Sequence, residues 1–306
     1  MKSMDGNEEG ELKVPKVVVC MAMVAKIVVY ILLMFTLAEI LGIFMYIFPA
    51  LKENGILCDV LTRTCLAGGA LLAAFILLKG WDHRPFADLG LSLKGRAKDM
   101  LWGLWVALVI YVVGFGILYG LGEVEIVSVH FNLNDLLMSW VLMLMVAVSE
   151  EVAFRGFVLG RLLSAGVNRF VALFLSSALF SLMHLLNPDF SLMAFLNILL
   201  AGVLMGSTYI YTRNLWFPIA LHLFWNWFQG PVLGLEVSGE QYGNTLLSLK
   251  LPEENLINGG AFGFEGSILC TALISIAIAV TLKSASKQSS SGPCPHSAPE
   301  PGRADE

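Results

Sequence analysis

The chain has 306 residues, of which 57% are hydrophobic and 14% are charged, and its net charge is −5. A soluble domain typically has about 25% charged residues, so the composition argues against a soluble protein and favours an integral membrane protein. The absence of a basic stripe argues against binding to nucleic acid. The five cysteines form no C-x-x-C pair, which argues against a thiolate metal site and against a disulfide framework.

Long apolar stretches follow one another along the chain and predict an all-α, polytopic membrane protein with about eight transmembrane helices. Residues 1–16 are expected to form a tail, 17–283 the membrane domain, and the Ser-, Pro- and Gly-rich residues 284–306 a disordered tail. The expected spans are 17–48, 60–78, 100–120, 136–158, 169–187, 191–212, 215–231 and 266–283.

The basic residues predict that both termini are cytoplasmic in a multi-pass protein of the cell membrane. They concentrate before the first span, after the even-numbered spans and after the last one, and the 79–98 loop is especially rich in them. This loop also contains Trp81 and Phe86, so we expect it to lie on the membrane surface. The opposite connections hold only Lys52, Arg63 and Lys250 as basic residues, together with nearly half of the acidic residues.

The fourth expected span carries a charged motif, Glu150-Glu151-x-x-x-Arg155, in an apolar stretch. Ionisable groups are costly in a membrane and are often functional there. Glu151 and Arg155 are four residues apart and can pair along one helix face, although a purely structural ion pair has the same pattern. Glu150 points about 100° away and is the freer carboxylate. We therefore consider Glu150 as a general base that activates water.

Two further polar pairs have the same one-turn spacing, namely Phe180 with His184 and His222 with Asn226. At about 1.5 Å per residue, Glu150, His184 and His222 are expected at similar depths. They would then meet in one water-accessible cavity within the helix bundle, toward its cytoplasmic half. Taken singly, each pair can also be explained as packing or as hydrogen bonding between helices. The coincidence of three motifs at one depth favours an active site.

The three motifs, in this order and at these spacings, resemble those of the CPBP (Abi) family of intramembrane proteases. This family includes the type II CAAX prenyl endopeptidases. The resemblance covers residues 136–230, the expected protease core. The stretch from Gly259 to Gly266 also resembles a segment that precedes the last span in some bacterial members. Its simpler interpretation is a turn with Glu265 near the N-terminus of a helix.

The resemblance implies a role for each motif residue. Glu150 corresponds to the glutamate that activates water and His184 to the histidine that helps to hold it. His222 and Asn226 correspond to the pair that stabilises the oxyanion, and Glu151, Arg155 and Phe180 are expected to support the site. We favour a mechanism without a metal cofactor. The alternative is a zinc ion held by Glu150, His184 and His222.

The resemblance implies an intramembrane endopeptidase that cleaves a peptide bond near the cytoplasmic membrane face. Its expected partners are membrane lipids and a peptide or protein substrate, either lipidated or an unlipidated leader or precursor, and no nucleic acid. The alternative is a non-proteolytic membrane scaffold or immunity protein that uses the same polar cluster to hold helices together or to bind a ligand. A transporter is disfavoured because the polar residues do not recur in two halves.

Overall fold

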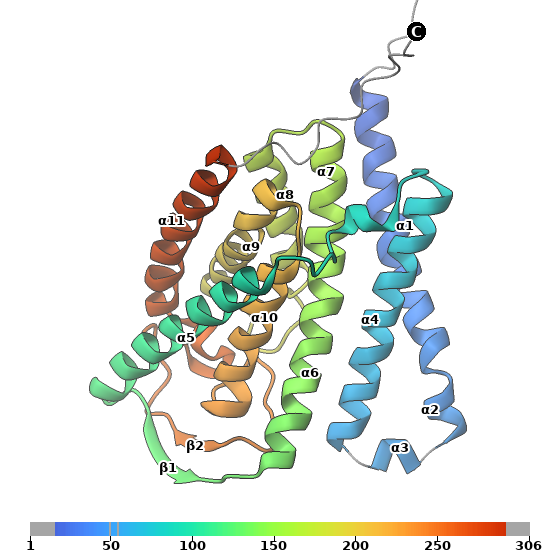
Figure 1. Ribbon diagram of the computed structural model, residues 1–306. Coiled ribbons are helices and arrows are strands. Elements are labelled where there is room, and N and C mark those ends of the chain that lie inside the picture. The colour runs from blue at the N-terminus through green and yellow to red at the C-terminus, as the bar shows by residue number, and fades with distance from the viewer. Residues whose placement is uncertain (1–15, 49, 54, 292–306) are drawn as a thin grey trace, which may run out of the picture.

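The computed structural model describes residues 16–48, 50–53 and 55–291, and these form a helical bundle with one small sheet (Figure 1). Of the expected tails 1–16 and 284–306, residues 1–15 and 292–306 lie outside the described residues, whereas Lys16 and residues 284–291 are helical. The main helices are α1 (Lys16–Gly42), α4 (Gly55–Gly80), α5 (Ala97–Gly120), α6 (Leu133–Glu151), α8 (Arg169–Leu182), α9 (Leu192–Thr212), α10 (Trp216–Trp227) and α11 (Ile268–Ser291). The shorter elements are α2 (Phe44–Ile47), α3 (Ala50–Glu53), α7 (Gly160–Ser164), five short helices of 3₁₀ or π type, and strands β1 (Glu125–Val129) and β2 (Leu247–Lys250).

The helical architecture expected from the apolar stretches is confirmed. Six helical segments of the described chain are long and apolar enough to cross a membrane. The other two expected spans correspond to α8 and α10, which are shorter, at 14 and 12 residues. The last helix continues to Ser291, beyond residue 283, where we expected the span to end.

The helices pack as a chain of neighbours that brings the motif-bearing segments together. Helix α1 packs on α4, α4 on α6, α6 on α10, and α10 on α5, while α8 and α11 both pack on α9 (Figure 1). Strands β1 and β2 pair antiparallel and connect the segment after α5 with the segment before α11. The sheet therefore lies at the end of the bundle where α6 begins and α5 finishes.

Two π-helical segments lie at the sequence motifs, the first including Arg155 and the second beginning two residues after Asn226. Residues Val152–Leu159 continue α6 as a π-helix, and all eight of them are buried. Residues Phe228–Val232 continue α10 in the same way and contain Pro231. A π-helix widens the turn, and π-bulges are frequent at functional sites. Sequence periodicity did not indicate either segment.

Close contact between α5 and α10 depends on Gly103. A Cβ atom on Gly103 would lie 2.7 Å from the backbone N of Leu221 and 2.8 Å from the backbone O of Phe217. We expect Gly103→Ala to lower the free energy of unfolding by about 1–3 kcal/mol, because backbone atoms cannot move aside as a flexible side chain can.

Thermal unfolding of the purified protein in detergent measures this effect. Gly116→Ala is the matched control, because it lies on the same helix and a Cβ there meets no atom within 4 Å. The control is expected to unfold at or slightly above the wild-type temperature, since Ala favours the helix over Gly. Equal melting temperatures for both variants would contradict the close packing at Gly103.

Candidate active site

Helix α6 places the two adjacent glutamates of the first motif in its last turn. Its N-terminus is capped by the side chain of Asn132, which accepts hydrogen bonds from the backbone N–H groups of Asn134 and Asp135. Glu151 is completely buried, whereas the side chain of Glu150 is 22% exposed and lines a cavity. The two carboxylates therefore face different surroundings, as the 100° rotation per residue predicts.

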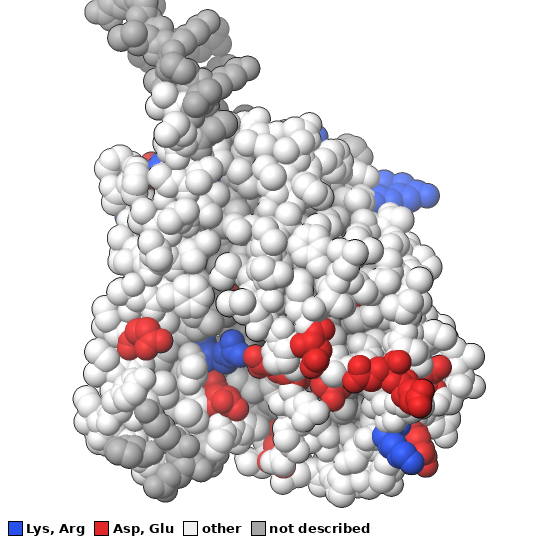
Figure 2. Space-filling model, turned by 180° about the vertical axis from the view of Figure 1, so that it is seen from behind, with Lys and Arg blue, Asp and Glu red and all other residues white. Residues whose placement is uncertain are grey.

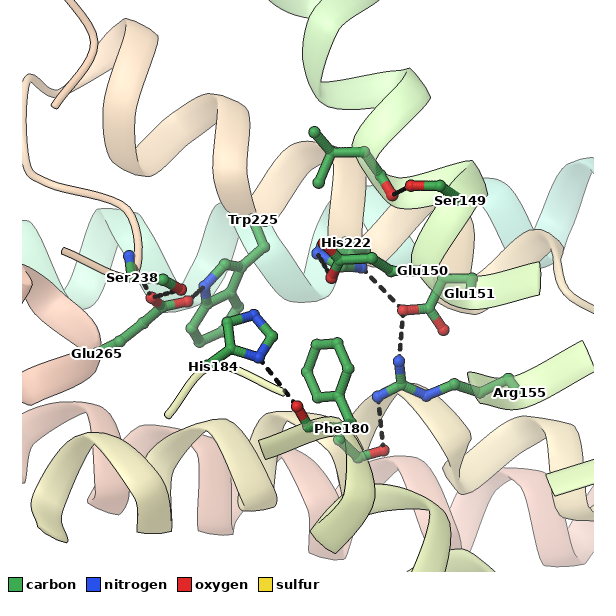
Figure 3. Close-up of polar contacts among 12 residues, drawn as sticks. Ser149, Glu150, Glu151, Arg155, Phe180, His184, His222, Trp225, Ser238 and Glu265 are labelled. Atoms are coloured by element: carbon green, nitrogen blue, oxygen red, sulfur yellow. Dashed lines mark hydrogen bonds and ion pairs between the residues drawn. The ribbon is translucent and has the colours of Figure 1, made fainter. Parts of the chain in front are cut away.

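Glu151 is the centre of a buried ionic network (Figure 3). Its Oε1 atom accepts a hydrogen bond from Arg155 Nη1 at 2.7 Å and a second one from His222 Nδ1 at 2.8 Å. Arg155 Nη2 also donates to the backbone carbonyl of Gly202 at 3.2 Å. The expected pairing of Glu151 with Arg155 is observed. The contact with His222 was not expected, and no spacing rule could have indicated it because α6 and α10 are distant in sequence.

His222 lies between the two glutamates. Its Nε2 atom is 3.7 Å from Glu150 Oε2, which is longer than a hydrogen bond. Its Nδ1 atom faces the acceptor Glu151, so Nδ1 carries a proton, and Nε2 points toward the cavity side of the site (Figure 3). Glu151 therefore fixes both the orientation and the tautomer of the His222 ring, as a carboxylate does in a serine-protease triad.

His184 lies just beyond the end of α8, which finishes at Leu182. We expected this span to continue to residue 187, but the chain turns at this point, and the His184 backbone N–H donates to Ser181 O at 3.1 Å. The ring Nδ1 atom is 2.9 Å from the Phe180 carbonyl oxygen, so Nδ1 is the donor and Nε2 is left to accept a hydrogen bond. The one-turn relation of Phe180 to His184 is thus kept by a hydrogen bond.

Phe180 packs among the polar groups of the site. Its ring centroid is 4.8 Å from that of His184 and 6.1 Å from that of His222, both edge-to-face. The guanidinium of Arg155 lies over the same ring, 4.4 Å from its centroid. An aromatic face attracts a cation in this position. Phe180 thus contacts both histidines and the buried arginine.

The side chains of the three motifs line one cavity, which has a volume of about 230 Å³. Glu150, His184, His222 and Asn226 all line it, together with Phe180. The structure therefore brings the three sequence motifs to one place. Asn226 is one helical turn after His222 and, like it, is buried. A polar cavity with a carboxylate, two imidazoles and an amide can hold water and polarise a carbonyl group.

The lining includes residues that the motif analysis missed, above all Glu265. Its Oε1 atom accepts a hydrogen bond from Trp225 Nε1 at 2.8 Å, and its Oε2 accepts from the Ser238 backbone N at 2.8 Å and from Ser238 Oγ at 2.7 Å (Figure 3). The only sequence signal was the glycine-rich stretch around it. Gly263 allows this stretch to pass close to the backbone of Glu236. Its φ is 83°, and a Cβ atom at this position would lie 1.9 Å from the Glu236 carbonyl oxygen.

The side chains of the site are not grouped as the ligands of a metal ion would be. Among the described residues, no three His, Cys, Asp or Glu side chains are grouped so that they could hold one. His222 Nδ1 is committed to Glu151, and His184 Nδ1 to Phe180 O. These hydrogen bonds leave both Nε2 atoms available, so the zinc alternative requires Glu150, His184 and His222 to move closer together but not to give up the bonds.

The mouth of the cavity carries charged residues. Arg63, on α4, forms an ion pair with Glu240 at 3.6 Å, and both line the cavity and are partly exposed. Tyr242 lines the cavity as well; burial and the neighbouring Glu240 raise the pKa of its phenol, which therefore stays protonated. Acidic side chains form a band across the face shown in Figure 2, toward the β1–β2 end.

The position of the cavity mouth in the bundle constrains the expected orientation of the protein in the membrane. Asn187, Ser238, Glu240 and Glu265 line the cavity from connections at the β1–β2 end of the bundle. The basic 79–98 loop connects α4 and α5 at the opposite end. If the basic loop is cytoplasmic, the cavity opens on the opposite side of the membrane. We expected both a cytoplasmic basic loop and a cavity that opens to the cytoplasm, and the structure allows only one of the two.

Comparison with known proteins agrees with the motif resemblance. Residues 132–228 match the family described as type II CAAX prenyl endopeptidase Rce1-like. No curated protein and no solved structure was found to match the chain. The matched segment begins at the cap of α6, includes all three motifs and ends two residues after Asn226. Residues 132–228 of this multi-pass membrane protein are therefore similar to the Rce1-like type II CAAX prenyl endopeptidases.

Proposed function

We propose that the protein is a glutamate-dependent intramembrane endopeptidase that hydrolyses a peptide bond inside the cavity. The observation that carries this proposal is that Glu150, His184, His222 and Asn226 line one cavity. Glu150 is the carboxylate of the pair that faces this cavity, while Glu151 is committed to Arg155 and His222. A partly desolvated carboxylate of this kind is suited to take a proton from water.

The first step is the attack of water on the scissile carbonyl carbon. A water molecule donates one hydrogen bond to Glu150 and another to the unoccupied Nε2 atom of His184. Glu150 takes a proton as the water oxygen forms its bond to the carbon, and the carbonyl becomes a tetrahedral oxyanion. Return of this proton to the amide nitrogen allows the C–N bond to break, which leaves a carboxyl group and a free amine. Atoms and protons balance without a cofactor.

The oxyanion is stabilised by donors on α10. Asn226 can donate from its amide group, and His222 can donate from Nε2. Because Nδ1 of His222 already donates to Glu151, a donor at Nε2 requires the imidazolium form. The buried Glu151 carboxylate, 2.8 Å away, stabilises this positive charge. Oxyanion donors are typically worth about 10²–10³ in rate each.

The substrate we propose is a peptide or protein that carries a lipid chain. The cavity wall includes Phe35 of α1 and Met183 at the end of α8, and both side chains are more than two-fifths exposed. In a membrane, these apolar side chains lie against acyl chains, so the cavity has an apolar side toward the lipid and a charged side at Arg63 and Glu240. This combination suits a lipidated peptide, whose tail stays in the bilayer.

Comparison of membranes that contain either the wild type or Glu150→Gln tests the proposal. The expected result is that one or a few membrane-associated peptides accumulate uncleaved with the variant, and that mass spectrometry identifies their shortened products with the wild type. A lipid group on these peptides would support the proposed substrate class. Identical peptide profiles for the two proteins, both present at equal levels, would overturn the proposed function.

A further inference from the structure

A second cavity lies at the end of the bundle opposite the β1–β2 sheet. It has a volume of about 340 Å³ and lies between α1, the segment after α4, and α7. Small-molecule sites typically have volumes of about 300–1,000 Å³. Its polar lining consists of Lys26, Asp82, Arg84, Arg161 and Ser164. None of these residues contributes to the proposed active site.

The charges in this cavity are unbalanced. Both oxygens of Asp82 are already used, one by Lys26 Nζ and the other by Arg161 Nη1 at 3.0 Å. Burial alone would raise the pKa of Asp82, but the hydrogen bonds from Lys26 and Arg161 lower it overall, so Asp82 is ionised. The lining thus contains three cationic side chains and one carboxylate, and the third cation, Arg84, pairs with Asp88 outside the lining. The cavity has an excess of positive charge.

Several donors in the cavity lack a full set of acceptors. Arg161 is only 8% exposed, and its Nε atom is buried without a hydrogen-bond partner among the described residues. Within the described part of the chain, the guanidinium of Arg84 makes two contacts, from Nη1 to Asp88 Oδ2 at 3.4 Å and to Ser164 Oγ at 3.2 Å. An unpaired buried donor is costly, and an anion in the cavity would supply the missing acceptors.

A further cation strengthens the positive field. Arg213 lies just after α9, and its Nη1 contacts the carbonyl oxygen of Gly160, the first residue of α7, at 3.5 Å. Burial lowers the pKa of Arg213, and repulsion from Arg161 and Arg84 contributes in the same direction. The cationic groups at this end therefore repel one another, and a bound anion would relieve this repulsion.

The side chains around the cavity are of the kinds found where a protein meets the membrane surface. Lys26 lies over the ring of Trp81, 5.5 Å from its centroid, and Trp81 is itself exposed. Tryptophan is enriched at the boundary between lipid and water. Val18 and Met23 of α1 line the cavity as well, so apolar surface adjoins the cationic groups. Basic pockets between transmembrane helices are known to bind lipid headgroups.

We propose that the Lys26–Arg84–Arg161 cavity binds a phosphate group, as carried by an anionic phospholipid headgroup or by free phosphate. The planar guanidinium groups of Arg84 and Arg161 suit the paired oxygens of a phosphate, and Lys26 adds a point charge. This site is separate from the proposed protease activity and does not depend on it.

Binding of short-chain lipids to the full-length protein in neutral detergent tests this site. We would use dioctanoylphosphatidylglycerol, inorganic phosphate, and dioctanoylglycerol, which has the same tails without the phosphate. Lipid retention in native mass spectrometry and the rise in melting temperature are the readouts. The wild type is expected to bind the phosphatidylglycerol and not the dioctanoylglycerol. Tighter binding of phosphatidylglycerol than of phosphate identifies a lipid site, whereas equal affinities identify a site for free phosphate.

Three variants connect this binding to the cavity. Arg84→Gln removes a partly exposed cation and is expected to weaken phosphate binding at least about tenfold, the effect of losing one charge-assisted contact. Asp82→Asn removes the competing carboxylate and is expected to strengthen binding. Lys283→Gln is the matched control, because it removes one exposed positive charge from α11 without touching the cavity. Equal binding by the wild type, Arg84→Gln and Lys283→Gln would overturn the proposal, as would equal binding of dioctanoylglycerol.

Discussion

Glu150→Gln is expected to lower the rate of peptide cleavage by roughly 10²–10⁴-fold, the usual contribution of a general base. The amide has almost the same shape as the carboxylate but cannot take a proton from water. Glu150 is the right residue for this test because its side chain lines the cavity and takes no part in the buried ion pair. The melting temperature of the variant is therefore expected to stay close to that of the wild type.

The control for this prediction is Glu240→Gln, which makes the same chemical change at the mouth of the same cavity. Its exposed ion pair with Arg63 contributes little stability, and the variant is expected to keep nearly the wild-type kcat, with any effect of the changed cavity mouth confined to KM. A scaffold function predicts the opposite outcome, in which Glu150→Gln leaves the biological phenotype unchanged. Wild-type cleavage by Glu150→Gln would refute the assignment of the base.

The same assay separates the two mechanisms considered for the site. Cleavage is expected to persist after the protein is stripped of metal with a chelator, because the site needs only a carboxylate, two imidazoles and an amide. Loss of activity that returns on addition of zinc would instead favour Glu150, His184 and His222 as ligands. This outcome would require the three side chains to move closer together, while the Nδ1 hydrogen bonds of His184 and His222 could stay in place.

The parts of the site that sequence could predict are those governed by local helix geometry. Glu151 and Arg155 pair because residues four apart share a helix face, and His222 and Asn226 reach the same cavity for the same reason. The location of His184 was less predictable. The span is interrupted at Leu182, and only the hydrogen bond to the Phe180 carbonyl preserves the one-turn relation.

Contacts between distant segments could not be predicted in this way. Nothing in the spacing of Glu151 and His222 indicates that they touch, because the contact depends on how α6 packs against α10. Glu265 is a stronger example. Sequence suggested a turn near a helix, whereas the structure places this carboxylate in the cavity wall, where it accepts hydrogen bonds from Trp225 and Ser238. Hydropathy cannot show which polar residue of a connection folds back into the bundle.

The second large effect is expected at Glu151, where stability and catalysis can be separated. Glu151→Leu leaves Arg155 buried without its carboxylate partner, and loss of one partner of a buried pair typically costs about 3–5 kcal/mol. We expect this variant to unfold at a much lower temperature in detergent. It should also cleave poorly, but a poorly folded protein does not show which role of Glu151 is responsible.

The double variant Glu151→Leu/Arg155→Met removes both charges of the pair. Replacing a buried ion pair with apolar side chains is often neutral or stabilising, so the melting temperature is expected to recover most of the loss. Cleavage is expected to remain low, because His222 Nδ1 no longer has the acceptor that sets its tautomer and stabilises its positive charge. If the double variant regains both stability and activity, Glu151 serves only to neutralise Arg155. If it regains stability alone, the Glu151–His222 hydrogen bond is part of the catalytic machinery, and the second glutamate of the motif acts through the histidine rather than through the arginine.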